Sequence, residues 1–560
     1  MTSKKCTHTE NFAKKSYDFI ILGAGAAGSS LARALSDSGE HSVLLVEWGL
    51  DLRSDPLVIN VSSEYGQFGP YRRTKNDFMQ EVVTAGVFNS LVNFEAGKGG
   101  PGGSTCHYFG NATRGQQWNE WAALLNDQRW SYENVLPIMK QIENYHGTTQ
   151  IPDQRGHNGV LDIYQNHPGS AQNDFLCQTM ASTWNVPILD DYNGNIPNVS
   201  AAMQRLVQEV NGVPTFRVWG ANFLPYEVLD ENGNGTNGRK LKALFETVAD
   251  KILFEDGKNP DKATGVTISS PKYGNHTFRA KKAVVITGGA YSAAILNRSG
   301  IGPSNVLKDI GVLPKFVNEN VGSHFQCHYG LCLPFDPATF PFPSFFEPGS
   351  AGIAVTFDDG NSVAKYNPAV FTPGKRRFER LFAGTGITEP RLAESNNVPL
   401  NAPTYLVWNM QSRSEGLIYA VSKDPYIEPQ VNFNFYSDGG LDDPASDISV
   451  NVAVLKSMRE FSNNLGCEML LPPASAFVND QELAKWARIV WHTTNHYMST
   501  TKMGTTPANS VCNSSGRVWG TDNVYCADAG IMPTMASGHT SIPAFVFGQL
   551  IGKFLLERYA

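Results

Sequence analysis

The sequence predicts a mixed α/β fold in which a parallel sheet is joined by a second, antiparallel sheet. An apolar run over 17–22 is followed by a glycine-rich turn, a helical pattern and another apolar run over 43–46, which is typical of a βαβ unit. A further apolar run over 283–287 also leads into a glycine turn and a helical pattern. Between 330 and 440, by contrast, short strand-like runs alternate with turn residues, which indicates antiparallel pairing.

The first βαβ unit carries a G-x-G-x-x-G motif between its strand and its helix. Gly23 permits a tight turn, Gly25 lets the backbone approach a pyrophosphate, and Gly28 lets the helix pack on the strand. The phosphates would then meet the positive N-terminus of the helix. Glu47 ends the second strand, where a carboxylate can accept hydrogen bonds from ribose hydroxyls. The motif in this setting predicts dinucleotide binding; the alternative is a glycine-rich turn that only packs.

The length of the chain indicates how many domains to expect, and its net charge indicates which kinds of partner to exclude. The 560 residues exceed what one hydrophobic core supports, so more than one domain is expected. A net charge of −7 argues against nucleic acid or an anionic membrane as the main partner. Residues 1–16 lack the apolar core of a secretory signal, and no apolar run is long enough to span a membrane. We therefore expect a small-molecule ligand, no membrane span, and an intracellular location unless a signal was removed.

The 8 cysteines are scattered and show no spacing typical of a zinc site, so no metal is expected. Free thiols in a reducing compartment are the expectation. Cys327 with Cys332, or Cys512 with Cys526, could form disulfides if the protein were exported.

The segments between these landmarks carry weaker signals. Residues 50–94 are rich in Gly, Pro and Asn and predict a long loop. Residues 97–107 hold so much glycine that their backbone could lie against a planar ligand, or form a loop without one. The patterns over 117–142 predict two short amphipathic helices, and those over 241–268 predict a small antiparallel sheet. A helix is expected over 450–470.

Aromatic side chains crowd one loop of the predicted antiparallel region. They could form core or the wall of a substrate entrance, and the sequence leaves both open. They are Phe335, Phe340, Phe342, Phe345 and Phe346.

Two histidines near the C-terminus are the candidate catalytic residues. His496 and His539 flank a strand-like run that ends in Asp528. Because imidazole titrates near neutral pH, one neutral histidine could take a hydroxyl proton while the other hydrogen-bonds the developing alkoxide. Residue types alone leave a structural role for both open.

Several motifs resemble, in order, those of the glucose-methanol-choline (GMC) family of FAD-dependent oxidoreductases. The segment 97–115 resembles the first signature of the family, and 288–302 resembles the second. Residues 320–328 then follow as in members of the family. Residues 496–504 match the segment that carries the catalytic histidine, and the separation of His496 from His539 fits the interval usual in the family.

The resemblance implies a Rossmann-like FAD-binding domain with a parallel sheet, and an antiparallel-sheet substrate domain covered by helices. The FAD-binding domain would be discontinuous, over 1–165, 205–322 and 490–560. The substrate-binding domain would comprise 166–204 and 323–489.

The resemblance further implies oxidation of a primary or secondary alcohol to an aldehyde or ketone. His496 would remove the hydroxyl proton while a hydride moves to flavin N5, and His539 would orient the substrate oxygen. Oxygen or another acceptor, such as a quinone, would reoxidise the flavin. The alternatives are a non-redox enzyme of the hydroxynitrile lyase type on the same fold, and a catalytically silent flavin-binding protein.

The family's cofactor contacts carry over to a defined set of positions. Val248 would contact the adenine side, and Asp528 with Ala529 would lie along the diphosphate and ribitol. His107 stands where some members attach the flavin covalently, and both covalent and non-covalent binding stay open. The complete set is Gly23, Gly25, Ala26, Ala27, Gly28, Glu47, Trp48, Gly103, Ser104, His107, Val248, Asp528, Ala529, His539, Thr540 and Ser541.

Overall fold

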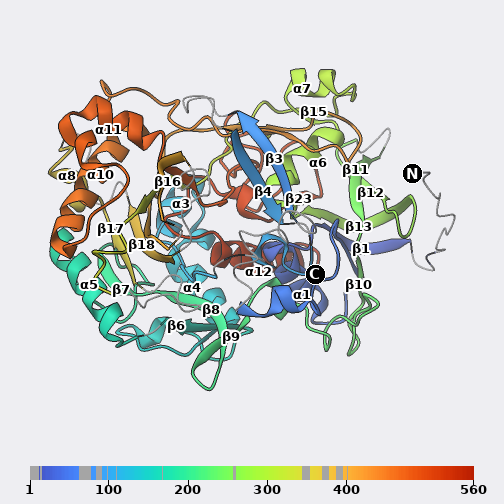
Figure 1. Ribbon diagram of the computed structural model, residues 1–560. Helices are drawn as coiled ribbons and strands as arrows, with labels where there is room; N and C mark the ends of the chain where they lie inside the picture. Colours follow the sequence, from blue (N-terminus) through green and yellow to red (C-terminus); the bar gives the residue numbers. More distant parts are fainter. Residues whose placement is uncertain are drawn as a thin grey trace, which may run out of the picture.

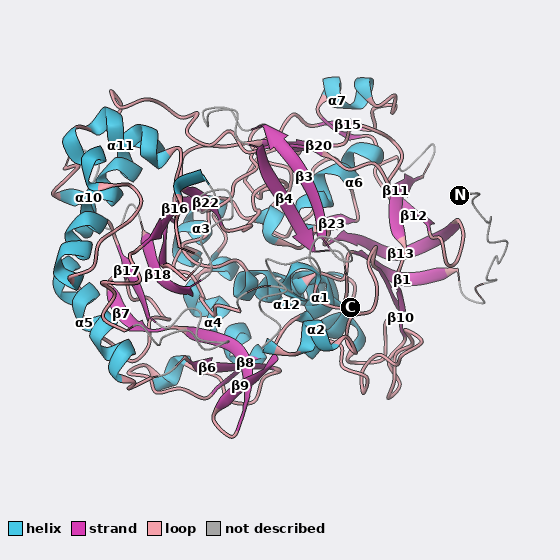
Figure 2. Cartoon of the chain, in the orientation of Figure 1, coloured by secondary structure: helices cyan, strands magenta, loops and turns pink. Residues whose placement is uncertain are grey.

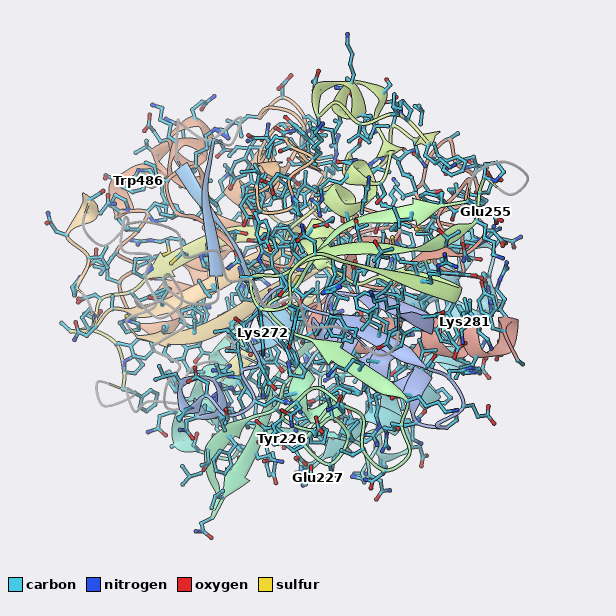
Figure 3. All side chains as sticks on the ribbon, turned by 90° about the vertical axis from the view of Figure 1, so that its right-hand side faces the viewer. Tyr226, Glu227, Glu255, Lys272, Lys281 and Trp486 are labelled. Carbon is cyan, nitrogen blue, oxygen red and sulfur yellow. The ribbon has the colours of Figure 1, made fainter. Side chains whose placement is uncertain are left out.

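Two large sheets with surrounding helices form the framework of the computed structural model (Figure 1). The structure describes residues 12, 15–61, 77–83, 91–97, 99–106, 108, 110–166, 168–255, 260–342, 354–368, 377–385, 395–399 and 401–560. Apolar side chains fill the interior, while the exposed Glu227 and Lys281 lie at the periphery (Figure 3). Among the described residues, no helix has the length and apolar character needed to cross a membrane.

The first sheet has seven strands in the order β10-β2-β1-β13-β12-β11, and β23 also pairs with β13. The strands β10, β2, β1, β13 and β23 run parallel to their neighbours, whereas β12 pairs antiparallel with β13 and β11. The predicted βαβ unit and the predicted strands near 283 and 524 are therefore confirmed. The seven strands are β1 (Ser16–Leu22), β2 (Val43–Val46), β10 (Leu241–Leu244), β11 (Val248–Phe254), β12 (Ala263–Ser269), β13 (His276–Ile286) and β23 (Val524–Cys526).

The predicted antiparallel sheet over 241–268 is correct for β11 and β12 and wrong for β10. β10 extends the parallel sheet, because Leu241 to Leu244 pair with Val43 to Val46 in the same direction. A four-residue apolar run contains no signal for strand direction.

Two helices from opposite ends of the chain pack together beside this sheet. They are α1 (Ala26–Ser36), which follows the first glycine motif, and α12 (Ser541–Arg558), at the C-terminus (Figure 1). Ser30 Oγ donates to the carbonyl of Phe545 at 2.8 Å. A Cβ on Gly548 would lie 2.3 Å from the carbonyl oxygen of Ala27, so only glycine permits this approach. The pairing brings the residues just before α12 close to the first glycine motif.

The second sheet has six antiparallel strands in the order β22-β16-β19-β18-β17-β7. It confirms the prediction of an antiparallel sheet from the 330–440 region. Helices α5, α10 and α11 lie along its outer side (Figure 2). The strands are β7 (Val199–Ala202), β16 (Tyr329–Pro334), β17 (Ala354–Asp358), β18 (Phe378–Thr385), β19 (Pro403–Asn409) and β22 (Trp491–Thr493), and the helices are α5 (Ala171–Trp184), α10 (Asp447–Leu465) and α11 (Asp480–Ala487).

The strand β22 lies within this second sheet, although the sequence assigns residues from 490 onward to the FAD-binding domain. Trp491, His492 and Thr493 pair with β16. The domain limits themselves stay a prediction, but β22 shows that the chain returns to the first sheet only after residue 493.

Smaller elements complete the fold, and the two helices predicted over 117–142 are confirmed. The loop predicted over 50–94 is wrong in part, because β3 and β4 form an antiparallel hairpin there. The described cysteines are buried. The remaining elements are α2 (Pro56–Ile59), β3 (Asp77–Val83), β4 (Leu91–Gly97), α3 (Trp118–Leu125), α4 (Tyr132–Ile142), β5 (Glu143–Tyr145), β6 (Leu161–Gln165), β8 (Gln204–Val210), β9 (Val213–Arg217), α6 (Ser292–Arg298), β14 (Ile301–Gly302), α7 (Ser304–Asp309), β15 (Phe316–Val317), α8 (Asn361–Ala364), β20 (Leu417–Tyr419) and β21 (Gln430–Asn432).

Candidate active site

A long cavity lies between the two sheets. Leu22, Val46 and Thr287, at the carboxyl ends of three parallel strands, line one side of it, and Leu406 and Trp408 of β19 line the other. In open α/β sheets, ligands bind outside the carboxyl ends of the strands. The cavity therefore occupies the place where a nucleotide cofactor is expected.

The glycines of the first motif meet different constraints. Gly23 has a φ of +113°, and a Cβ there would lie 2.6 Å from the carbonyl oxygen of Thr287. A Cβ on Gly28 would lie 1.9 Å from the carbonyl oxygen of Gly23, so this glycine permits the packing of α1 on β1. At Gly25 the nearest protein atom to a Cβ would be 3.8 Å away, and Gly25 lines the cavity together with Ala26 and Ala27. The space that a side chain would occupy at Gly25 is therefore open to a ligand and is not filled by other protein atoms.

Glu47 lies at the cavity wall with its carboxylate held by the backbone. Oε2 accepts from the amide of Ala24 at 2.7 Å, and Oε1 accepts from the amide of Gly49 at 2.8 Å. Trp48 and Val248 line the same end of the cavity, and the Trp48 ring packs edge-on against Tyr291 with centroids 5.8 Å apart.

The second glycine segment packs directly on the first. The amide of Gly102 donates to the carbonyl of Ala24 at 2.6 Å, and a Cβ on Gly102 would lie 2.5 Å from the Trp219 ring. Gly103 and Ser104 line the cavity. His107 lies outside the described residues, so covalent and non-covalent binding at this position both stay open.

Asp528 connects the end of β23 to the turn after β13. Its Oδ2 accepts from Ser292 Oγ at 2.6 Å and from the amide of Gly289 at 2.9 Å, while Oδ1 accepts from the amide of Gly530 at 2.7 Å. Burial raises the pKa of this carboxyl to about 6, although the three donors lower it. These hydrogen bonds hold the backbone of Ala529 against the cavity.

The two candidate catalytic histidines face each other in the cavity. His496 follows β22 and His539 precedes α12, and their ring centroids lie 4.6 Å apart with an interplanar angle of 76°. Both line the cavity, as do Thr540 and Ser541. The structure thus brings together two side chains that the sequence places far apart.

His496 has a hydrogen-bond partner to which sequence reasoning assigned no role. His328, just before β16, has its Nδ1 2.9 Å from His496 Nδ1 and its Nε2 2.6 Å from the carbonyl oxygen of Ala536. The only sequence signal was the position of His328 at the end of a segment that follows the second signature.

His539 also has a partner that the sequence did not reveal. Glu379 Oε1, on β18, lies 2.9 Å from His539 Nε2. The side chain of Glu379 is fully buried, and Trp408, its neighbour across the strands, packs edge-on against His539 with centroids 5.5 Å apart. A lone carboxylate in a buried strand was the signal that could have identified it.

The surroundings favour neutral imidazoles. Burial lowers the pKa of His328 to about 3, and the hydrogen bond to the carbonyl of Ala536 only partly opposes this. Burial is also the main reason that the pKa of His496 lies well below its usual value, with further lowering by His539, His328 and His492. At neutral pH both His328 and His496 therefore lack a charge.

Of the two roles left open for the aromatic loop, the described phenylalanines have the first, because they belong to the core and not to the cavity wall. Phe335 and Phe340 are buried, Phe340 stacks on Phe382 with centroids 5.4 Å apart, and Phe342 packs against Phe175. None of the three described members lines the cavity. The other two members, Phe345 and Phe346, lie outside the described residues.

Comparison with known proteins identifies similar chains along the whole length. Two family models, both described as GMC oxidoreductase, match residues 228–330 and 412–548. Pyranose dehydrogenase 3 of Leucoagaricus meleagris is 24% identical, covering 97% of this chain and 93% of its own. Oxygen-dependent choline dehydrogenase of Proteus mirabilis (strain HI4320) is 27% identical, covering 95% and 94%. The crystal structure of pyridoxine 4-oxidase from Mesorbium loti superposes with a TM-score of 0.78 at 20% identity, covering 96% and 98%.

Proposed function

We propose that this chain, which belongs to the GMC oxidoreductase family and uses FAD, oxidises a primary or secondary alcohol to an aldehyde or a ketone. The observation that carries the proposal is the pair of facing imidazoles, 4.6 Å apart, in the cavity that starts at the first glycine motif. The relatives act, by their names, on choline and on a pyranose, both of which carry hydroxyl groups.

The residues that line the cavity are of the kinds that would hold FAD. The N-terminus of α1 has Gly25 at its cap with no side-chain hydrogen bond, so its backbone amides are available to a diphosphate. Glu47 and Val248 lie at one end, where the adenosine part would bind, and Asp528 with Ala529 would hold the middle. When bound, the flavin supplies the acceptor for the hydride that leaves the alcohol carbon.

His496 is the proposed base. A general base must hold a free lone pair at working pH, and the lowered pKa of His496 gives it one at neutral pH. The oxidation removes a proton from the hydroxyl group and a hydride from the carbon. His496 takes the proton, and the electron pair of the O–H bond then forms the carbonyl bond as the hydride leaves.

His539 is the proposed orienting residue. Because the carboxylate of Glu379 accepts a hydrogen bond, His539 Nε2 carries a proton. Asn111 Nδ2 lies 3.3 Å from the same nitrogen and is also a donor, so it forms no hydrogen bond with a protonated Nε2. In the neutral ring Nδ1 then has no proton, so only the imidazolium form of His539, paired with the carboxylate of Glu379, can donate from Nδ1 to the substrate oxygen. The described residues provide no other partner for this nitrogen.

An anaerobic alcohol panel tests the proposal. Aryl, aliphatic, sugar and amino alcohols would be mixed with the purified holoenzyme while the flavin absorption band and the carbonyl product are followed. Bleaching of the band with one carbonyl product per reduced flavin is the expected result. Oxygen or a quinone added afterwards identifies the acceptor, because oxygen would yield peroxide.

The same experiment separates the alternatives. An enzyme of the hydroxynitrile lyase type would release aldehyde from a cyanohydrin while the yellow colour stays intact. A silent flavin-binding protein would show neither bleaching nor product with any compound, and that result would overturn the proposal.

A further inference from the structure

His328 contacts His496 from outside the cavity lining, in a position that can control the chemistry of His496. It is fully buried, and both of its ring nitrogens are engaged. Its ring meets that of His496 edge-on, with centroids 5.2 Å apart and an interplanar angle of 90°. The Nδ1 atoms of the two rings are the atoms that meet, at 2.9 Å.

The proton positions follow from the partners. A carbonyl oxygen only accepts hydrogen bonds, so His328 Nε2, 2.6 Å from the carbonyl of Ala536, must carry a proton. A neutral imidazole has a single N–H, and His328 stays neutral because burial lowers its pKa to about 3. Its Nδ1 is therefore a bare acceptor.

A bare acceptor on His328 requires a donor on His496. The hydrogen bond at 2.9 Å forms only if His496 Nδ1 carries the proton. Since burial and the neighbouring histidines keep His496 neutral as well, its Nε2 then has no proton. Nε2 is the ring nitrogen that remains for a ligand in the cavity.

We propose that His328 is a positioning residue that fixes the proton of His496 on Nδ1 and thereby makes Nε2 the basic nitrogen of the site. The inference rests on the proposed function, in which His496 is the base. Without a partner at Nδ1, neutral His496 could carry its proton on either nitrogen, and molecules protonated on Nε2 could not accept the hydroxyl proton.

The arrangement also keeps the transferred proton on His496. Once Nε2 accepts a proton, the ring is an imidazolium, and its Nδ1–H bond to His328 becomes charge-assisted. His328 cannot take that proton readily, because it would become a buried cation beside His539. The other titratable groups that face His496 are His539 and His492, with Glu379 on the far side of His539.

Two substitutions of similar size separate the two hydrogen bonds of His328. In His328→Asn, Oδ1 takes the place of Nδ1 and can accept from His496, while the donor to the carbonyl of Ala536 is lost. In His328→Gln, the amide nitrogen takes the place of Nε2 and can donate to Ala536, while the acceptor for His496 is lost. Each variant would be prepared as holoenzyme, and its thermal midpoint and its rate of anaerobic flavin reduction would be measured.

The two variants should affect opposite properties, one the thermal midpoint and the other the rate of flavin reduction. His328→Asn should lower the thermal midpoint and keep the reduction rate within about threefold of wild type, because the tautomer of His496 is retained. His328→Gln should keep the midpoint and lower the rate by about 10²-fold, because a wrong tautomer disables a histidine base. A role in stability alone would make the rates follow the midpoints, and that pattern would overturn the proposal.

Nitrogen NMR of histidine-labelled protein gives a readout that does not depend on turnover. The signals of His496 are those lost in His496→Ala. We expect a protonated Nδ1 and a bare Nε2 in wild type and in His328→Asn, and a mixture of both tautomers in His328→Gln. A proton on Nε2 in wild type would refute the role of His328 even if alcohols reduce the flavin. Failure of every alcohol to reduce the wild-type flavin would refute the proposed function instead.

Discussion

Glu379 Oε1 lies 2.9 Å from His539 Nε2, and the carboxylate that holds this histidine is fully buried. Its second oxygen, Oε2, has no hydrogen-bond partner in the described part of the chain. Arg377 is the nearby cation; its guanidinium donates to the carbonyl of Ser537 at 2.7 Å, and burial lowers its pKa to about 10. The second histidine of the pair is thus oriented by a carboxylate from the second sheet.

Replacing Glu379 by Gln should slow substrate oxidation by about 10- to 100-fold, because a charged acceptor is exchanged for a neutral one of the same size. The FAD content should stay at the wild-type level. Anaerobic flavin reduction measures the rate. Glu482→Gln is the control, since Glu482 forms an exposed ion pair with Lys485 at 2.6 Å, and it should leave the rate unchanged. Equal rates in Glu379→Gln and the control would show that the carboxylate has no part in the reaction.

Two glycine substitutions in the first motif should have different consequences. A Cβ at Gly28 would lie 1.9 Å from the carbonyl oxygen of Gly23, so Gly28→Ala should destabilise the apoprotein itself. At Gly25 a Cβ would have 3.8 Å to its nearest protein atom, so Gly25→Ala should preserve the apoprotein and reduce FAD binding by crowding the diphosphate. Thermal midpoints of the apoproteins and flavin content after purification measure the two effects. Full flavin content in Gly25→Ala would mean that the cofactor does not approach this residue.

The buried His328 should make stability depend on pH. Its folded-state pKa of about 3 lies below the value of 6.5 for a free histidine, so below pH 6.5 the unfolded chain binds a proton that the folded chain does not. This lowers the free energy of unfolding as the pH falls from 6.5 toward 3, by about 1.4 kcal/mol per pH unit.

His328→Asn removes this dependence. Between pH 7 and pH 5, its deficit in the free energy of unfolding relative to wild type should shrink by about 2 kcal/mol. Urea unfolding of both proteins at the two pH values measures the change. A deficit that is the same at both pH values would show that His328 is not held neutral.

Much of the fold was predictable because its signals are local. The strand, glycine turn and helix at Gly23 to Gly28 lie within one continuous stretch, and so do the strand and acid that end at Asp528. The hairpin of β3 and β4 was missed because the surrounding Gly, Pro and Asn residues obscured two short strands. The direction of β10 was wrong because it depends on which neighbour the chain meets after a loop.

The partners of the two facing histidines could not be predicted for a similar reason. His328 and Glu379 are single polar residues in or beside buried strands of the second sheet, far from His496 and His539 in sequence. They contact the two histidines only because the second sheet lies across the cavity from the first sheet in the folded protein. Sequence periodicity reports which face of a strand is buried, and it does not report which element covers that face.

The rate of anaerobic flavin reduction in His496→Ala, measured by stopped flow with an alcohol that reduces the wild-type holoenzyme, tests the central claim most directly. His146→Ala is the control, because His146 stacks on Tyr164 and its side chain is partly exposed. We predict that His496→Ala keeps its FAD and is reduced about 10²- to 10⁴-fold more slowly than wild type, while the control matches wild type. Reduction of His496→Ala at the wild-type rate would contradict the account.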